Sequence, residues 1–355
     1  MLQHLRKFDW ILIIASVLLV GFGLVSIYNI SPTYFLKQVI FLGIGIVLMF
    51  ILSFFDWRGF RENPYFILVL YSICLLFLLG LFFFVPEIRG VKGWYKIGSV
   101  SFDPIGLTAI VLTILLAKYF SMRHIEMYKL SHILLSGFYV LLPVVLIFFQ
   151  PDLGSVLILI ALWLGVLIVS GIKLNHFLIL ILCGLLVLTL SWSFLLKDYQ
   201  KERIVSFLKP QVEVLGINWS QAQSKIAIGS GGIFGQGLGE GSQTQYGFLS
   251  EPHTDFIFAV IAEEFGLIGI SVLLFLFVIL IWRIMKIAIS AHANFPRLFA
   301  SGIVILLFSQ IFIHIGMNLG ILPVVGISLP FVSYGGSNLI AIFIGLGILQ
   351  SIRTH

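Results

Sequence analysis

The feature that most constrains this sequence is a series of long segments without any Asp, Glu, Lys or Arg. These segments cover residues 10–36, 38–55, 63–86, 104–117, 130–151, 153–172, 174–196, 265–282 and 298–352. A helix needs about 20 mostly apolar residues to cross a bilayer. The last segment has 55 residues, enough for two helices, and its stretch 321–330 contains two prolines and a glycine that suit a turn between them. The sequence therefore predicts ten transmembrane helices.

Composition supports this fold class. Only 36 of the 355 residues are charged, which is 10%, whereas soluble proteins carry about 25%. This composition excludes a soluble globular domain, a disordered chain and a disulfide scaffold. We expect an all-α polytopic membrane protein, with residues 1–355 forming a single integral membrane domain. The predicted spans are approximately 10–29, 35–55, 64–85, 104–120, 132–150, 153–171, 174–195, 256–283, 298–320 and 334–352.

The distribution of positive charge predicts the orientation. Ten spans place both termini on one side of the membrane, and short cytoplasmic loops are enriched in Lys and Arg. The short loops of the opposite side hold only four such residues, Lys37, Arg89, Lys92 and Lys96. The terminal side holds twelve, namely Arg6, Lys7, Arg58, Arg61, Lys118, Arg123, Lys129, Lys173, Arg283, Lys286, Arg297 and Arg353. Both termini are therefore predicted to be cytoplasmic, and the net charge of +6 indicates no nucleic-acid partner.

Polar chemistry is concentrated on the side opposite the termini. The predicted extracytoplasmic loop 197–255, between the seventh and eighth spans, holds 11 of the 36 charged residues. The shorter loop 87–103 and the turn at Asp152 lie on the same side. This layout is typical of an enzyme or receptor that works at the outer membrane face. A coupled transporter more often places ionisable groups near the midplane.

The loop contains a glycine-rich segment, GSGGIFGQGLGEG, over 229–241. Ser220 and Gln223 before it form a capping-box pattern, which predicts a helix over 221–228 that Gly229 ends. The glycine-rich segment lacks the Walker Lys-Ser/Thr and the G-x-G-x-x-G spacing, so it does not indicate a nucleotide fold. Two interpretations remain open, a flexible turn and a backbone that closely approaches a ligand.

Three carboxylates surround the start of the eighth predicted span. Asp255 is the last charge before the apolar helix, where it fits either a helix N-cap, a favourable anion at the positive helix end, or a site residue. Glu263 and Glu264 lie about 12 Å further along the helix. Buried carboxylates need partners, so we expect a structural pair held by a cation or by backbone amides. His253, two positions before Asp255, is the only histidine that we consider a site candidate.

Two long motifs resemble the SEDS family (shape, elongation, division and sporulation proteins). They are QSKIAIGSGGIFGQGLGEGSQTQYGFLSEPHTDFIFAVIAEEFGLIG at 223–269 and GMNLGILPVVGISLPFVSYGGSNLI at 316–340. QPDLGS at 150–155 and RGVKGWYKIG at 89–98 precede them in the order typical of the family. The resemblance covers nearly the whole chain, and the short termini are more similar to the elongation member RodA than to the division member FtsW.

The resemblance implies a peptidoglycan glycosyltransferase that polymerises lipid II at the outer face of the bacterial cytoplasmic membrane, with a class B penicillin-binding protein as partner. It assigns the catalytic role to Asp255. A divalent cation, Mg²⁺ or Mn²⁺, is a candidate cofactor, with no certain cofactor and no identified metal ligand. The expected contacts to the lipid II substrate are Lys225, Ser230, Gly231, His253, Thr254, Asp152, Trp94, Arg89, Lys92 and Ser333.

The chain departs from the family on the fourth predicted span. The family pattern F-Q-P-S-E-F-A-K reads FDPIGLTA at 102–109 here, so Gly106 and Ala109 stand in place of a glutamate and a lysine. Removing both partners of a buried ion pair is less costly than removing one. The departure motivates the alternative of a catalytically weakened scaffold for a penicillin-binding protein. A flippase or transporter for lipid-linked precursors is the other alternative.

Overall fold

The fold is that of a helical bundle with one small β-hairpin, seen in a computed structural model that describes residues 6–59, 64–86, 93–98, 100–123, 130–194, 201, 205 and 217–354. Two short antiparallel strands, β1 (Tyr95–Ile97) and β2 (Val100–Phe102), pair in the hairpin. The helices are α2 (Trp10–Ile30), α3 (Pro32–Phe54), α5 (Pro64–Phe84), α6 (Ile105–Arg123), α7 (Leu130–Phe149), α8 (Leu153–Val169), α9 (Leu174–Phe194), α11 (Ile217–Ser230), α12 (Ser242–Gln245), α13 (Ile257–Ser290), α14 (Asn294–Leu319) and α15 (Gly336–Thr354).

The membrane-spanning helices agree in number and order with the predicted spans. Among the described residues, nine helices are long and apolar enough to cross a membrane, and α8, with 17 residues, is a shorter apolar tenth. The all-α polytopic fold is therefore confirmed. Several helices extend past their apolar segments. For example, α13 continues to Ser290 where the sequence predicts an end at 283, because the residues after Arg283, IMKIAIS, continue the helix past the charged position.

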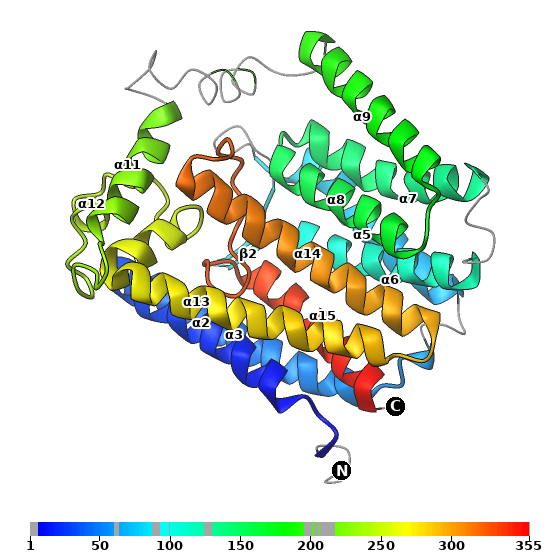
Figure 1. The fold of residues 1–355 in the computed structure, drawn as a ribbon, viewed down its shortest axis with the longest axis horizontal. Coiled ribbons are helices and arrows are strands. Elements are labelled where there is room, and N and C mark those ends of the chain that lie inside the picture. The colour runs from blue at the N-terminus through cyan, green and yellow to red at the C-terminus, as the bar shows by residue number, and fades with distance from the viewer. Residues whose placement is uncertain are drawn as a thin grey trace.

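Two helices, α14 and α15, occupy the middle of the bundle. Helix α14 packs against α13, α6 and α8, while α15 packs against α3 and α6. Helix α2 completes the layer formed by α3 and α13, and α5 and α7 cover the other side. In Figure 1 both chain termini lie at one end of this bundle, whereas α11 and α12 lie at the opposite end.

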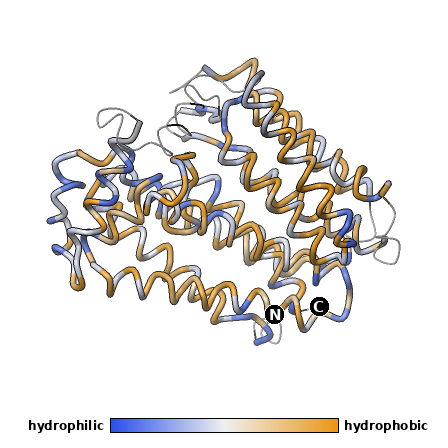
Figure 2. Tube along the Cα trace, turned by 45° about the horizontal axis from the view of Figure 1, so that its top comes forward, coloured by the Kyte–Doolittle hydropathy of each residue, from blue (hydrophilic) through white to orange (hydrophobic). Residues whose placement is uncertain are grey.

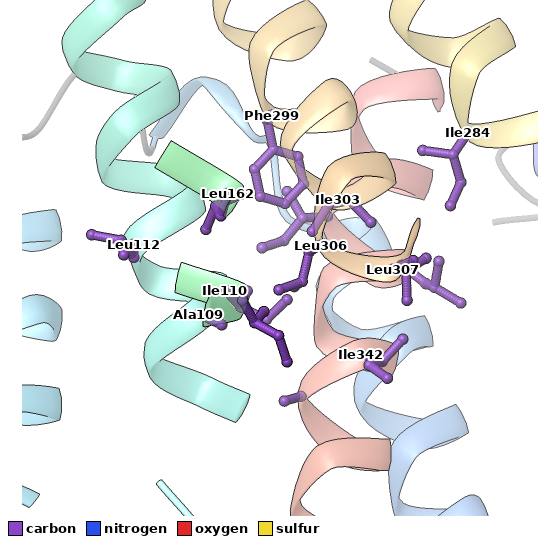
Figure 3. Packing of buried hydrophobic residues seen from close by; sticks show 14 of the residues in the cluster. Ala109, Ile110, Leu112, Leu162, Ile284, Phe299, Ile303, Leu306, Leu307 and Ile342 are labelled. Atoms are coloured by element: carbon purple, nitrogen blue, oxygen red, sulfur yellow. The ribbon is translucent and has the colours of Figure 1, made fainter. Parts of the chain in front are cut away.

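The buried core is centred where α6, α8, α14 and α15 meet. Figure 3 shows Ile110 of α6, Leu162 of α8, Leu306 of α14 and Ile342 of α15 pointing toward one another. All four side chains are at most 3% exposed. The outer helices differ, since the 18-residue apolar window of α9 has no residue buried within the described structure. Its apolar side chains are therefore available to lipid or to a partner.

Local sequence explains where several helices begin and end. The Asp9 carboxylate caps α2 by accepting a hydrogen bond from the Leu12 N–H, as N-cap residues do. Pro32 stands at the first position of α3, where its missing N–H costs nothing. Gly320 ends α14 in the left-handed conformation (φ 76°), which glycine adopts without steric cost.

Hydropathy divides the molecule along the helix axes. Apolar residues cover the middle of the helices in Figure 2, while hydrophilic residues gather at the end with α11 and α12 and at the end with the termini. The bundle therefore presents two polar ends separated by an apolar band, as a membrane-spanning protein requires.

Candidate functional site

The candidate site lies at the end of the bundle opposite the termini, where the turn before α13 meets the segment 316–336. This turn comprises residues 251–256, and Glu251 begins it with a positive φ of 50°. The amides of Thr254 and Asp255 both donate to the Glu251 carbonyl, at 3.2 Å each. The turn is therefore closed on itself, which fixes the direction of the chain just before the helix begins.

Asp255 faces the segment 316–336. A methyl group built on Gly326 lies 3.8 Å from one carboxylate oxygen of Asp255. The N-cap position of α13 is occupied by Phe256, so the interpretation of Asp255 as the helix N-cap is wrong. It lies one residue before the cap, at the helix end that carries partial positive charge.

Asn318 joins Asp255 to helix α11. The fully buried Asn318 donates from Nδ2 to the Asp255 carbonyl at 2.9 Å. Its own backbone carbonyl accepts a 2.9 Å hydrogen bond from the Ser224 hydroxyl. Gln221, one turn earlier on α11, donates to the carbonyls of Met317 (3.0 Å) and Leu322 (2.8 Å). Helix α11 is thereby attached to the end of α14 directly beside Asp255.

Lys225 follows Ser224 on this attached helix. A methyl group built on Gly320 lies 3.4 Å from the Lys225 ammonium nitrogen. Lys225 and Asp255 therefore border the same segment, near Gly320 and Gly326 respectively. The structure thus places a carboxylate and an ammonium group, 30 positions apart in the sequence, against two glycines of one segment.

His253, Thr254 and Ser333 connect the turn to the start of α15. The hydroxyl of Ser333 donates to the Thr254 carbonyl at 2.7 Å and accepts from the Leu329 N–H at 2.8 Å. The Tyr334 N–H donates to the His253 carbonyl at 2.8 Å. The imidazole of His253 stacks on Tyr34, with 4.4 Å between ring centroids. These contacts give the three residues a positioning role for the turn that carries Asp255.

Asp152 lies on the other side of the same segment. Its carboxylate caps α8 by accepting from the Ser155 N–H (3.0 Å) and hydroxyl (2.6 Å). Gly154, two residues later, is so close to Val325 that an added methyl group would lie 2.7 Å from the Val325 carbonyl oxygen. Asp152 and Asp255 thus border one loop, and Asp152 also has a structural function at the start of α8.

Asp103 is a further carboxyl group of this region. Its N–H donates to the Ser337 hydroxyl oxygen at 2.9 Å, which connects the chain after β2 to the start of α15. The pKa of the Asp103 carboxyl is raised from 3.8 to about 7, chiefly because burial removes water from the charged form. The hydrogen bond from the Ile105 N–H opposes this rise in pKa, and the negative charge of Asp152 adds to it.

The glycine-rich segment 229–241 packs against helix α13 instead of forming a flexible turn. Its amides donate to α13: Gln236 to the Glu263 carbonyl (2.9 Å) and Gly237 to the Glu264 carbonyl (3.1 Å). The Glu263 carboxylate accepts from the amides of Gln243 (2.7 Å) and Thr244 (3.2 Å). The Glu264 carboxylate accepts from the Gly239 N–H at 3.0 Å, so the expectation that backbone amides hold the two glutamates is confirmed. The close backbone approach is to α13.

Ser230 and Gly231 lie at the far end of α11 from Gln221. The predicted helix boundaries 221–228 are wrong, because α11 begins at Ile217 and includes Ser230. A methyl group on Gly231 would lie 1.9 Å from the Ala262 carbonyl oxygen, so close packing on α13 already requires glycine there. Ser230 donates to the Ala227 carbonyl at 2.9 Å. A substrate contact at either position stays a prediction.

Three other residues are predicted to contact the substrate. Trp94 is 39% exposed and directly precedes β1. Arg89 and Lys92 lie outside the described residues. Their expected roles at the diphosphate therefore stay predictions.

The fourth span shows what replaces the family's ion pair. A methyl group on Gly106 would lie 3.3 Å from the Ala341 side chain and 3.3 Å from the Asn338 amide oxygen. Ala109, one turn later, is only 4% exposed. Helices α6 and α15 therefore pack directly against each other where the family has glutamate and lysine side chains.

A resident metal centre does not fit the side chains of this region. In the part of the chain that the structure describes, no three His, Cys, Asp or Glu residues cluster closely enough to hold a metal ion. The expectation of a divalent cation stays a prediction, and no chemical step below depends on it.

The sequence analysis missed two buried residues that hold the site together. Asn318 lies within the motif at 316–340, but the motif alone does not indicate its role. Gln38, which is 1% exposed, donates to the Ser333 carbonyl (3.2 Å) and accepts from the Gly335 N–H (3.3 Å). The available signal was an amide side chain inside an apolar helix, because such a group must find a partner when it is buried.

Comparisons with known proteins agree with this architecture. The model of the FtsW/RodA/SpoVE family, described as cell cycle protein, matches residues 4–355. The peptidoglycan glycosyltransferase MrdB of Escherichia coli is 38% identical over 315 residues, which cover 88% of this chain and 84% of the relative. The stage V sporulation protein E of Bacillus subtilis is 33% identical and covers 98% of this chain and 97% of its own.

Solved structures show the same fold. A chain from a structure described as "Structural coordination of polymerization and crosslinking by a peptidoglycan synthase complex" superposes with a TM-score of 0.83 at 32% identity, covering 98% of this chain and 97% of that one. The rod shape determining protein RodA of Thermus thermophilus gives a TM-score of 0.73 at 30% identity, covering 98% and 96%.

The fold and the site thus define a polytopic helical membrane protein with a carboxylate site at one polar end. The chain belongs to the FtsW/RodA/SpoVE family, and the SEDS resemblance read from its motifs is confirmed.

Proposed function

We propose that this protein is a peptidoglycan glycosyltransferase that polymerises lipid II into glycan strands during cell-wall elongation. The observation that carries the proposal is the position of Asp255. Its carboxylate faces the segment 316–336, which Lys225 and the Asp152 turn also border. Relatives named peptidoglycan glycosyltransferase and the RodA structure support the activity and the elongation subtype.

Asp255 acts as the general base. Lipid II carries an α-linked sugar diphosphate and the polymer contains β-1,4 links, so one inverting displacement suffices. The carboxylate removes the proton from the acceptor's 4-hydroxyl, whose oxygen then attacks the anomeric carbon of the donor. The bond from that carbon to the diphosphate breaks, and undecaprenyl diphosphate leaves with the electron pair. A positioned base typically contributes about 10²–10⁴-fold to such a rate.

Lys225 stabilises the departing diphosphate. Negative charge develops on the leaving oxygen, and a preorganised cation lowers the free energy of that transition state. The ammonium group is held beside Gly320 because Gln221 and Ser224 anchor α11 to the end of α14. Acceptor activation and leaving-group stabilisation thus come from two groups that border the segment 316–336.

The proposal also places the protein in the cell. The apolar helices make it a multi-pass membrane protein, and the family relationship supports the bacterial cytoplasmic membrane as its location. We place both termini in the cytoplasm and the Asp255 end outside, following the distribution of Lys and Arg. The related synthase complex, whose description joins polymerisation to crosslinking, supports a class B penicillin-binding protein as partner.

The test is polymerisation by purified protein, with the partner and a divalent cation each added or omitted. Wild type and Asp255→Asn are incubated with lipid II, and glycan strands are resolved on a gel. We expect Asp255→Asn to lower the rate by about 10²–10⁴-fold without changing the melting temperature. The amide keeps the size of the side chain but removes the base.

Glu240→Gln is the matched control, because Glu240 is an exposed carboxylate of the same polar end. The control should polymerise like wild type. Unimpaired strand synthesis by Asp255→Asn would remove Asp255 as the base. No strands from wild type in any condition would refute the activity itself.

A further inference from the structure

A basic pocket lies at the end of the bundle that carries the termini. It has a volume of about 570 Å³, which is in the range of small-molecule sites. Its charged and aromatic lining residues are Asp9, Trp57, Arg58, Arg283, Lys286, His292 and Arg353. These come from the N-terminus, from the ends of α3, α13 and α15, and from the turn before α14. The pocket and the candidate active site lie at opposite ends of α13, which is kinked at Gly266.

The pocket carries an excess of positive charge. Four cationic side chains, Arg58, Arg283, Lys286 and Arg353, line it with a single carboxylate, Asp9. Arg58 has a partner outside the lining, Asp56, at 3.6 Å. After both carboxylates are counted, the charge is still 4 − 2 = +2, with His292 taken as neutral.

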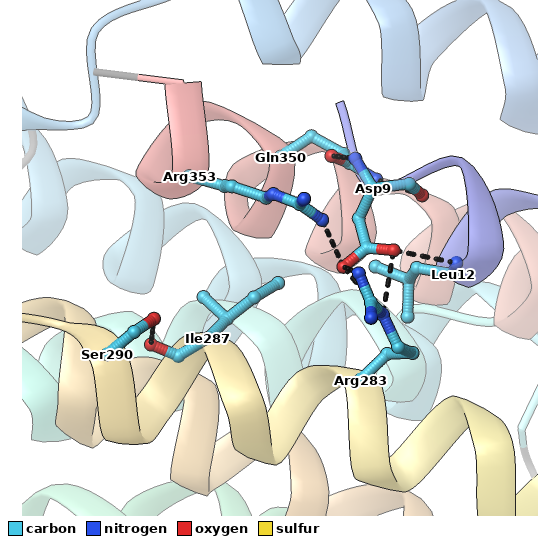
Figure 4. Close-up of polar contacts among 7 residues, drawn as sticks. All are labelled: Asp9, Leu12, Arg283, Ile287, Ser290, Gln350 and Arg353. Carbon is cyan, nitrogen blue, oxygen red and sulfur yellow. Dashed lines mark hydrogen bonds and ion pairs between the residues drawn. The ribbon is translucent and has the colours of Figure 1, made fainter. Parts of the chain in front are cut away.

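The oxygens of Asp9 are already occupied. Figure 4 shows the Asp9 carboxylate between the guanidinium groups of Arg283 and Arg353. Arg283 donates to it from Nε at 2.9 Å and from Nη2 at 2.6 Å, and the Leu12 N–H donates at 3.1 Å. One carboxylate shared by two guanidinium groups leaves a positive charge without compensation, on side chains that are only 16% (Arg283) and 35% (Arg353) exposed.

Two further donors of the pocket lack an acceptor. The Trp57 side chain is only 7% exposed, and its indole N–H has no hydrogen-bond partner. Its ring is held in place by stacking on Phe295, with 5.7 Å between centroids. Within the described part of the chain, no hydrogen bond or ion pair is found for the Lys286 ammonium. A buried unpaired donor is costly, so the Trp57 indole N–H points to a ligand that supplies acceptor oxygens. The Lys286 side chain is exposed and adds positive charge to the lining.

Two exposed tryptophans indicate the depth of the pocket in the membrane. Trp10 follows Asp9 and is 46% exposed, and Trp282 precedes Arg283 and is 63% exposed. Exposed tryptophan is enriched at the level of the lipid headgroups. The ion pair between Asp9 and Arg283 therefore lies at the depth of the lipid phosphate groups.

We propose that this pocket binds a phosphate group, carried by an anionic phospholipid of the surrounding leaflet or by a free phosphate. A phosphate offers several acceptor oxygens and negative charge, and it matches the planar donor fork of arginine. Basic pockets between transmembrane helices are suited to anionic headgroups. The bound anion compensates the charge of the two arginines and accepts from Lys286 and Trp57. It thereby connects the ends of α3, α13 and α15.

The test compares two probes on the purified full-length protein. One is phosphatidylglycerol in nanodiscs, measured against phosphatidylcholine, and the other is inorganic phosphate in detergent. Binding is followed by native mass spectrometry for the lipid and by the melting temperature for phosphate. The variants are Lys286→Gln and Trp57→Phe, which remove one donor each and leave the bonds of Asp9 intact. Phenylalanine retains the stacking on Phe295.

We expect each variant to weaken binding by about tenfold, the factor expected for one hydrogen bond to a charged group. Arg297→Gln is the control, because it removes an exposed positive charge at the same end but outside the pocket lining. If the two pocket variants lose the preference for phosphatidylglycerol and Arg297→Gln keeps it, the ligand is a lipid headgroup. The same pattern with inorganic phosphate, and no lipid preference, identifies free phosphate.

Two outcomes overturn the proposal. The first is that wild type binds phosphatidylglycerol no more tightly than phosphatidylcholine and is not stabilised by phosphate relative to buffer. The second is that Arg297→Gln weakens binding as much as the pocket variants do. The second result would mean that net charge attracts the anion without a defined site.

Discussion

Carboxyl groups at the same polar end differ in their surroundings, and those surroundings determine what each residue does. Glu263 is fully buried and accepts hydrogen bonds from the amides of Gln243 and Thr244, so it is a structural group. Asp152 caps α8. Asp255 is only partly buried, it caps no helix, and its carboxylate faces a loop that also borders Lys225. It is therefore the carboxylate best placed to meet substrate.

Asp103 predicts a pH dependence of stability. Its pKa is about 7 in the folded protein and near 3.8 when it is unfolded, so the folded state binds the proton more tightly between these values. Stability from this group is present below about pH 4 and is lost as the pH rises through about 7. We expect Asp103→Asn to flatten the curve of melting temperature between pH 5 and 8.

Asp56→Asn, which changes an exposed carboxylate at the other end, should leave that curve unchanged. A wild-type curve that does not fall relative to the Asp103→Asn curve would show that Asp103 is ionised throughout this range.

At the scale of elements, close contact between backbones determines how the polar end attaches to the bundle. Helix α11 and the glycine-rich segment pack on the first turns of α13, and Gly231 and Gly235 leave no room for a side chain there. Helix α6 meets α15 less tightly at Gly106, where a methyl group would lie 3.3 Å from side-chain atoms of Ala341 and Asn338. The absence of a Cβ atom therefore permits the contact at Gly231 and Gly235.

Gly231→Ala tests the first contact. The added methyl group would lie 1.9 Å from the Ala262 carbonyl oxygen, and overpacking of this kind costs about 1–3 kcal/mol. We expect a lower melting temperature and faster proteolysis within 229–241, both measured in detergent. Gly229→Ala is the control, because nothing lies within 4 Å of a methyl group at Gly229. Equal melting temperatures for the two variants would contradict the packing argument.

The double substitution Gly106→Glu with Ala109→Lys tests the second contact. Restoring the family's pair would place two long side chains where α6 and α15 already touch. We therefore expect a fall in melting temperature and no gain in polymerisation. Higher activity at unchanged stability would show instead that α15 moves aside, and that the missing pair weakens the wild-type enzyme.

At the scale of the whole molecule, Asp9 connects three parts of the chain that are far apart in sequence. It accepts from Arg283 of α13 and Arg353 of α15, and its N–H donates to Gln350 across a sequence separation of 341 residues. Both ends of the chain are thereby fixed to the same place. Tight attachment of the termini fits a bundle whose middle layer includes the last helix, α15.

Asp9→Asn removes the charge of the only carboxylate between the two arginines. Breaking a buried ion pair by removing one partner costs about 3–5 kcal/mol, so we expect a large fall in the melting temperature. The matched change Asp56→Asn breaks an exposed pair with Arg58, which is worth only about 0–1 kcal/mol. Similar small effects of both substitutions would mean that Asp9 is not an anchor of the termini.

The sequence by itself determined the membrane-spanning helices, because a span depends only on the length and hydropathy of a local segment relative to the thickness of the bilayer. It also identified the polar end and Asp255, which lie within long motifs. Only the tertiary structure decided which groups meet. Three contacts join distant residues: Asn318 bridges Ser224 and Asp255, the amides of α12 hold the Glu263 carboxylate, and Asp9 binds Arg353 near the other end of the chain. Such contacts depend on how the helices pack, and hydropathy along the chain does not encode that packing.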